Sequence, residues 1–125
     1  MSSLWGIDLG GTKVEGAILK SASDTQVLFR DRLPTEGHQG YEHILGQIKR
    51  VVEKMEASQG YKPQKIGIAT PGTLDPSTKL LKNSNSTSLN GKPLRADLEN
   101  LLGIEVAMAN DANCFAVAEA KMGIV

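Results

Sequence analysis

The segment Gly6-Ile7-Asp8-Leu9-Gly10-Gly11-Thr12-Lys13 carries the strongest structural signal in this chain. It begins as an apolar run with one charge, Asp8, and ends at two glycines and a hydroxyl residue. Residues 14–19 are again apolar or small, without a helix-length pattern. We therefore predict a buried strand over residues 4–9, a turn at 10–12 and a second strand over 14–19. A turn cluster at 21–25 and an apolar triplet at 27–29 predict a third strand, which would complete an antiparallel meander.

The turn at residues 10–12 also has the chemistry of an anion site. Glycine lets the backbone approach a ligand closely and point N–H groups at it. The carboxylate of Asp8 would repel a bound phosphate unless a cation lay between them, so Asp8 implies Mg²⁺, held through water. The stretch is not a Walker A loop, because Thr12-Lys13 stands where that loop has lysine and then serine or threonine. An ordinary hairpin turn with a solvent-facing aspartate is the alternative.

The rest of the chain alternates helices and strands. Apolar side chains recur three and four apart over residues 41–55 and predict an amphipathic helix that ends at Gly60. We expect a buried strand at 66–69, a long polar loop at 70–92, a helix from Pro93 to Gly103, a strand at 104–109 and a helix from Asn110. The order strand-strand-strand-helix-strand-helix-strand-helix predicts an α/β fold, a mixed five-stranded sheet with helices packed on it.

Two more polar groups follow strands of this sheet. Asn110-Asp111 ends a strand and begins a helix. Asp111 suits a helix N-cap, or a carboxylate that accepts a proton from an attacking substrate hydroxyl. Residues 70–73 and 83–86 offer hydroxyls and amides that suit a sugar, or form a plain polar loop. Because three strands deliver polar groups to what is expected to be one sheet end, we expect a ligand site there.

Composition excludes several classes of protein. The 125 residues carry 14 basic and 14 acidic side chains, so zero net charge argues against general nucleic-acid binding. One cysteine, Cys114, excludes an internal disulfide or a Cys-rich zinc site. We see no signal peptide and no apolar run of membrane length, and expect a cytoplasmic protein without membrane or nucleic-acid partners. We expect Trp5 in the core or in edge packing, Met55 in the core, Cys114 buried in its helix, and the histidines, His38 and His43, at the surface.

Four motifs in order carry a family resemblance. Residues 6–13 resemble the first phosphate-binding motif of the ROK family of sugar kinases and repressors, and residues 68–73 its "GIG-x-PG" strand end. Residues 83–94 are similar to the sugar-loop segment of its fructokinase and mannokinase branch. Residues 109–116 look like the catalytic segment shared by those enzymes and N-acetylglucosamine kinases. The resemblance covers essentially the whole chain.

The resemblance implies an actin-like ATPase, RNase H-like lobe and an ATP-dependent kinase acting on the 6-hydroxyl of a fructose, mannose or glucose type hexose. Asp111 matches the family's catalytic base. The positions that match its sugar site are Gly72, Thr73, Asn85 and Asn110. Those that match its ATP-phosphate and Mg²⁺ region are Asp8, Gly10, Gly11, Thr12 and Lys13, with Asp8 toward the metal.

The sequence also departs from the family, whose members are longer and have two lobes around a cleft. The second lobe carries the adenosine pocket, a second phosphate loop and usually a zinc site, and no zinc ligands stand here. The resemblance therefore implies that residues 1–125 are an amino-terminal lobe, inactive alone, and it leaves a homodimer of the full-length protein open. Other readings are an N-acetylglucosamine or other N-acylhexosamine kinase, a non-catalytic sugar-responsive ROK regulator, and an actin-like ATPase without a sugar substrate.

Overall fold

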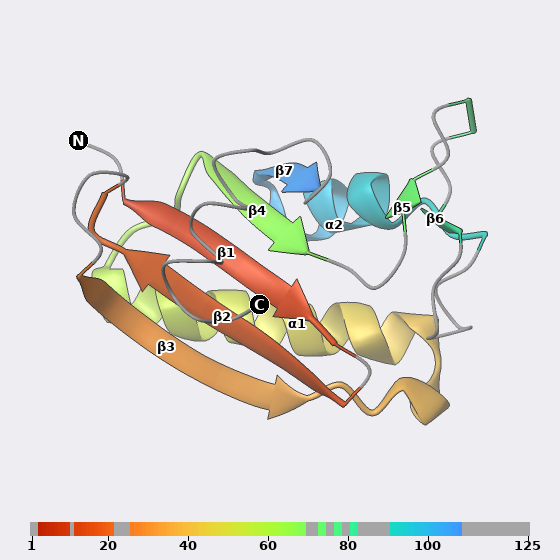
Figure 1. The fold of residues 1–125 in the computed structure, drawn as a ribbon, viewed down its shortest axis with the longest axis horizontal. Helices are drawn as coiled ribbons and strands as arrows, with labels where there is room; N and C mark the ends of the chain where they lie inside the picture. The colour runs from red at the N-terminus through yellow and green to blue at the C-terminus, as the bar shows by residue number, and fades with distance from the viewer. Residues whose placement is uncertain are drawn as a thin grey trace.

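A computed structural model describes residues 3–10, 12–21, 26–69, 73–74, 77–78, 81–82 and 91–108. Its centre is a five-stranded mixed sheet in the order β3-β2-β1-β4-β7 (Figure 1). The strands are β1 (Leu4–Leu9), β2 (Lys13–Leu19), β3 (Val27–Pro34), β4 (Lys65–Ala69) and β7 (Glu105–Met108). The predicted mixed five-stranded sheet is confirmed.

The first three strands form the expected antiparallel meander. β1 pairs with β2 from Leu4↔Leu19 to Leu9↔Val14, and β2 pairs with β3. β4 joins β1 in parallel, and β7 joins β4 in parallel. β3 continues to Pro34, beyond the predicted triplet at 27–29, because it is an edge strand whose charged residues at 30–32 alternate between exposed and half-buried positions.

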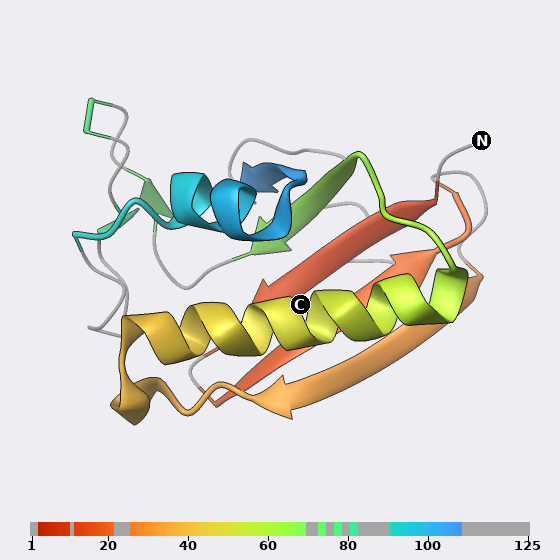
Figure 2. The ribbon, with the colours of Figure 1, turned by 180° about the vertical axis from the view of Figure 1, so that it is seen from behind.

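Two helices cover one face of the sheet (Figure 2). α1 (Tyr41–Gln59) packs on β2 and β3, and α2 (Leu94–Leu102) packs on β7 and contacts α1. Their apolar stripes meet the inner residues of the sheet in one core. Both helices end as predicted, at Gly60 and Gly103, because each glycine adopts the left-handed conformation that caps a helix C-terminus.

Some expectations need correction or lie outside the described residues. Within the predicted loop at 70–92, β5 (Thr73–Leu74) and β6 (Leu81–Lys82) form a two-stranded antiparallel ladder too short for a periodic signal. A 3₁₀ turn, η1 (Gly37–Gln39), precedes α1. The helix expected from Asn110, with Cys114, lies outside the described residues. Among the described helices, none is long and apolar enough to cross a membrane.

The sequence also predicted the burial of several individual side chains. Trp5 and Met55 are buried in the core, as expected. Trp5 packs edge-on against Tyr61, with ring centroids 5.6 Å apart. His38 is exposed, but His43 is half-buried, and its Nε2 lies 2.7 Å from Oε1 of Glu36. Both histidines therefore lie at the surface, as expected, and 31% of the His43 side chain is exposed beside Glu36.

Candidate functional site

The carboxyl ends of three neighbouring strands lie together at one end of the sheet. β1, β4 and β7 run parallel, with Asp8 paired to Ala69 and Ile68 paired to Met108. Ligands of open α/β sheets bind outside the carboxyl ends of the strands. The chain therefore leaves β4 toward residues 70–73, and β7 toward residues 109–111, at the sheet end where Asp8 lies.

Only part of the predicted site falls within the described residues. Asp8, Gly10, Thr12 and Lys13 are described, and Thr73 is described by its backbone in β5. The other predicted positions lie outside the described residues: Gly11, Gly72, Asn85, Asn110 and Asp111. For these residues, the structure gives the strand ends that they follow and nothing more.

The turn between β1 and β2 is closed by its own backbone. The N–H of Gly10 donates to the carbonyl of Lys13 over 2.9 Å. A Cβ at Gly10 would lie 3.2 Å from that same oxygen, so a side chain would crowd the turn. The Gly10 N–H is therefore occupied within the hairpin, and a phosphate bound here would be contacted by other groups of the turn. One of the N–H donors expected from the glycine pair is thus already bonded and does not face an anion.

Thr35 braces this turn from the end of β3. Its side chain is buried, with 1% of its surface exposed. Its hydroxyl donates to the carbonyl of Gly10 over 2.8 Å, and its N–H donates to the carbonyl of Thr12 over 3.0 Å. Sequence reasoning missed Thr35, because no spacing or pattern marks a threonine that follows an edge strand.

Asp8 has an unfavourable electrostatic environment for its charge. Its pKa is raised, first by partial burial and then by the nearby carboxylate of Glu15, while the ammonium of Lys13 acts in the opposite direction. A bound cation would relieve this penalty. Mg²⁺ keeps several waters and binds through one or two carboxylates plus substrate phosphates, so a single half-buried carboxylate next to a glycine turn fits it. Among the described residues, no group of three or more His, Cys, Asp or Glu side chains could hold a metal by itself.

Glu15 is a second residue, this one charged, that the sequence analysis did not identify. It lies directly opposite Asp8 in the β1–β2 register, so both side chains share one face of the sheet. Only 6% of Glu15 is exposed. Arg30 Nε donates to its Oε2 over 2.6 Å, and Lys13 Nζ lies 3.8 Å from its Oε1. The available signal was that Glu15 is the one charge inside the apolar run 14–19.

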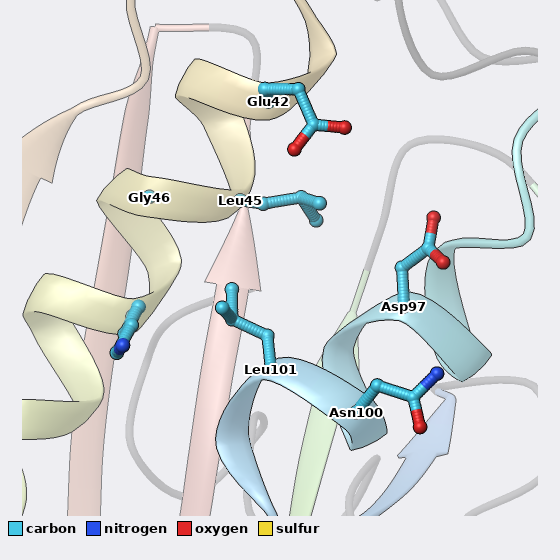
Figure 3. Close-up of a pocket in the computed structure, with 7 residues that line it drawn as sticks. Glu42, Leu45, Gly46, Asp97, Asn100 and Leu101 are labelled. Atoms are coloured by element: carbon cyan, nitrogen blue, oxygen red, sulfur yellow. The ribbon is translucent and has the colours of Figure 1, made fainter.

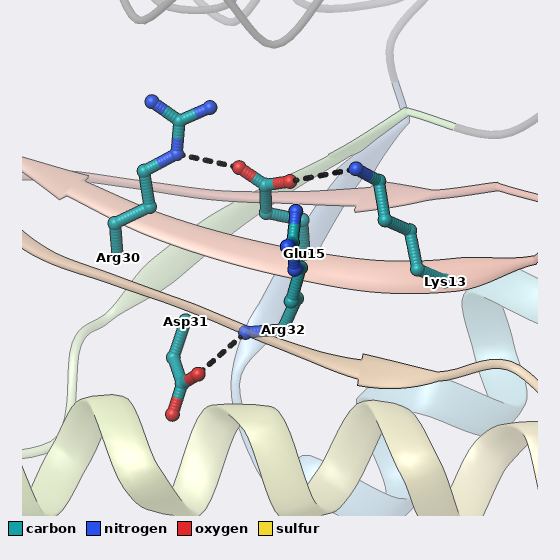
Figure 4. A network of polar contacts seen from close by, with 5 residues as sticks. All are labelled: Lys13, Glu15, Arg30, Asp31 and Arg32. Atoms are coloured by element: carbon teal, nitrogen blue, oxygen red, sulfur yellow. Dashed lines mark hydrogen bonds and ion pairs between the residues drawn. The ribbon is translucent and has the colours of Figure 1, made fainter.

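This charged cluster lies on the face of the sheet away from α1. Figure 4 shows Lys13, Glu15 and Arg30 pointing to that face, whereas Asp31 points toward α1. Asp31 accepts a hydrogen bond from Lys54 of that helix over 3.0 Å. Lys13 is half exposed at the end of β2, next to the turn. A flexible ammonium in this place could reach a phosphate while Glu15 keeps it near the turn.

A groove on the opposite face does not match the predicted site. It runs between α1 and α2 (Figure 3) and is lined by Glu42, Leu45, Gly46, Lys49, Asp97, Asn100 and Leu101. Close to it, the Tyr41 hydroxyl donates to Asp97 over 2.7 Å, and burial and then Asp97 raise the pKa of Tyr41. Lys92 Nζ lies 5.5 Å from the centroid of the Tyr41 ring. None of these residues belongs to the predicted site.

Comparison with known proteins agrees with this arrangement. The model of the ROK family matches residues 4–124. An N-acetyl-D-glucosamine kinase of Pasteurella multocida is 38% identical over 117 residues, which cover 93% of this chain and 37% of that enzyme. The chain therefore spans little more than a third of the length of this curated relative.

Solved structures share the fold. A ROK family glucokinase from Streptomyces griseus, in complex with glucose and AMPPNP, superposes with a TM-score of 0.74 at 25% identity. The match covers 98% of this chain and 37% of that one. A polyphosphate/ATP-glucomannokinase from Arthrobacter sp. strain KM gives a TM-score of 0.74 at 28% identity, over 98% of this chain and 49% of that one. The described sheet and helices are thus those of ROK sugar kinases, which have the actin-like ATPase fold.

Proposed function

The chain belongs to the ROK family, and from this we propose that it is the amino-terminal lobe of a two-lobed kinase that transfers phosphate from ATP to a sugar hydroxyl. The observation that carries the proposal is the parallel alignment of β1, β4 and β7. It supports a site in which the Asp8 turn meets the segments that follow the other two strands. The similarity to a glucokinase in complex with glucose and AMPPNP also supports a sugar and ATP as the two substrates.

One end of the proposed site would bind the sugar and remove its proton. In the proposed reaction, Asp111 takes the proton from the sugar 6-hydroxyl as that oxygen attacks the γ-phosphorus of ATP. The bond from the γ-phosphorus to the bridging oxygen breaks, and ADP leaves. Asn110, Asn85, Gly72 and Thr73 would hold the sugar.

The opposite end of the site would hold the nucleotide phosphates. Lys13 would contact them from the end of β2, and Gly10, Gly11 and Thr12 would shape the turn beside them. Asp8 would hold Mg²⁺ through water. Bound Mg²⁺ supplies positive charge to the phosphate oxygens. Catalysis would then consist mainly of positioning the two substrates in line.

The acceptor is proposed to be a hexose or an N-acetylhexosamine. The similarity to N-acetyl-D-glucosamine kinases extends over more than nine-tenths of this chain, which favours N-acetyl-D-glucosamine as the acceptor to test first. The preference for fructose or mannose expected from residues 83–94 stays a prediction, because that segment lies mainly outside the described residues.

A panel of acceptors tests the proposal. The full-length product of the gene is assayed for coupled ADP release with ATP, Mg²⁺ and N-acetylglucosamine, glucose, mannose or fructose, each against a no-sugar control. The proposal predicts sugar-dependent ADP release with one or two of these acceptors. Residues 1–125 alone are expected to give none. ADP release at the same rate with and without sugar would favour an ATPase. No ADP release at all from a folded protein would favour a sugar-binding regulator.

A further inference from the structure

Thr35 is a buried polar residue to which the proposed mechanism gives no part. It lies between β3 and η1, outside every sequence motif, and its hydroxyl and its backbone N–H both donate to the turn between β1 and β2. The hydroxyl holds the carbonyl of Gly10 and the N–H holds the carbonyl of Thr12, at 2.8 and 3.0 Å. One side chain and one peptide from a separate segment therefore fix two carbonyls of the same four-residue turn.

Fixing a carbonyl also fixes the N–H that follows it. A trans peptide is planar, with its C=O and N–H on opposite sides, so a held oxygen sets the direction of the next N–H. Thr35 thereby fixes the plane of the Thr12–Lys13 peptide and the direction of the Gly10 carbonyl. Both groups border the turn that a nucleotide phosphate would contact, and the Gly10 N–H on the same turn is already bonded to Lys13.

Thr35 is itself held from α1. Gln47 is 3% exposed within the otherwise apolar stripe of that helix, and its Nε2 donates to the carbonyl of Pro34 over 2.6 Å. The Pro34–Thr35 peptide is thus bonded through its oxygen to the helix and through its N–H to the turn. A buried glutamine with a defined partner is a stable anchor, since an unpaired buried amide would be costly. The turn is in this way connected to the core of the protein.

We propose that Thr35 is a positioning residue for ATP, holding the turn at residues 10–13 in the conformation that receives the nucleotide phosphates. The inference rests on the proposed function, because it assigns the turn to the nucleotide. It predicts that loss of the Thr35 hydroxyl weakens nucleotide binding and leaves sugar binding unchanged.

Two substitutions at this position separate positioning from simple packing. Thr35→Val keeps the shape and the backbone N–H but removes the hydroxyl, and Thr35→Ser keeps the hydroxyl. In the full-length protein, Thr35→Val is expected to raise the Kd for AMPPNP and the KM for ATP by about 3- to 10-fold, which is the effect of losing one hydrogen bond. Thr35→Ser should restore both constants to near the wild-type values. The KM for the sugar should not change in either variant.

A control variant removes a hydrogen bond at the other end of the sheet. Tyr61→Phe loses the contact with Ser3 beside Trp5, and it should leave the Kd for AMPPNP unchanged. An unchanged Kd in Thr35→Val, or equal rises in the sugar and ATP constants, would overturn the inference. A wild-type protein that binds AMPPNP but phosphorylates no sugar would contradict the proposed function, and the effect of Thr35→Val on the Kd would still decide this inference. Failure of the wild type to bind AMPPNP would contradict both.

Discussion

Gly16 is a point where α1 approaches the sheet closely, and Gly16→Ala is expected to destabilise the protein. A Cβ on Gly16 would lie 2.5 Å from Cγ1 of Val51, 2.7 Å from Sδ of Met55 and 3.2 Å from Cδ1 of Ile7. All three neighbours are fully buried. Met55 can adjust its unbranched side chain, but Val51 is branched at Cβ and stiff. Overpacking of this kind costs about 1–3 kcal/mol of the free energy of unfolding.

The same chemical change in α1 serves as a matched control. Gly46 is a helical glycine, and a Cβ built there would have no atom within 4 Å. Gly46→Ala should therefore raise the free energy of unfolding by about 0.5–1 kcal/mol, since alanine loses less conformational entropy in a helix. The two variants each add one methyl group and should shift stability in opposite directions.

Urea denaturation measures both effects. The single tryptophan, Trp5, is packed on Tyr61 in the folded protein, so its fluorescence should report unfolding. We expect a lower midpoint for Gly16→Ala, a higher midpoint for Gly46→Ala and an unchanged slope for both. A Gly16→Ala variant as stable as the wild type would contradict this prediction, because α1 could not then lie so close to β2.

Three further predictions concern the charged and polar contacts. Glu15→Gln removes a buried charge to which Arg30 donates, so we expect the free energy of unfolding to fall by about 1–3 kcal/mol in urea, and no measurable fall would contradict this. The pKa of Asp8 is raised above 3.8 in the folded protein. Between pH 3.8 and this raised pKa, the folded state therefore binds more protons than the unfolded state. The free energy of unfolding is thus expected to fall as the pH rises from 3.8 through the pKa of Asp8 in the folded protein. Asp8→Asn should show a smaller fall and be more stable than the wild type at pH 7. Lower stability of this variant at pH 7 would contradict the prediction. Tyr41→Phe removes the hydrogen bond to Asp97 that joins the two helices, and it should lower the free energy of unfolding by about 0.5–1.5 kcal/mol, measured with the wild type as reference.

The elements that bury a continuous apolar face could be predicted from the sequence. The apolar runs of β1 and β2 meet at glycines, and the meander follows from local signals alone. The stripe of α1, with Ile44, Ile48 and Met55, is regular because one side of the helix is fully buried. Gly60 and Gly103 marked both helix ends, since only a left-handed residue caps them there.

The elements that depend on distant partners could not be predicted. β3 is an edge strand, so its residues beyond Phe29 carry little apolar signal. The burial of Glu15 depends on Arg30, fifteen residues away along the chain. Thr35 acts through backbone carbonyls 25 and 23 residues earlier, and backbone acceptors leave no trace in a sequence.

Asp111 is the proposed base, and its replacement is the sharpest test of the proposed phosphate transfer. In the full-length protein, Asp111→Asn keeps the size of the side chain and one acceptor oxygen but cannot take up the proton of the sugar hydroxyl. We expect kcat for sugar-dependent ADP release to fall by about 10²- to 10⁴-fold, with the KM for the sugar close to that of the wild type. If Asp111→Asn turned over at a rate near that of the wild type, Asp111 would not be the base, and the proposed reaction at this sheet end would be wrong.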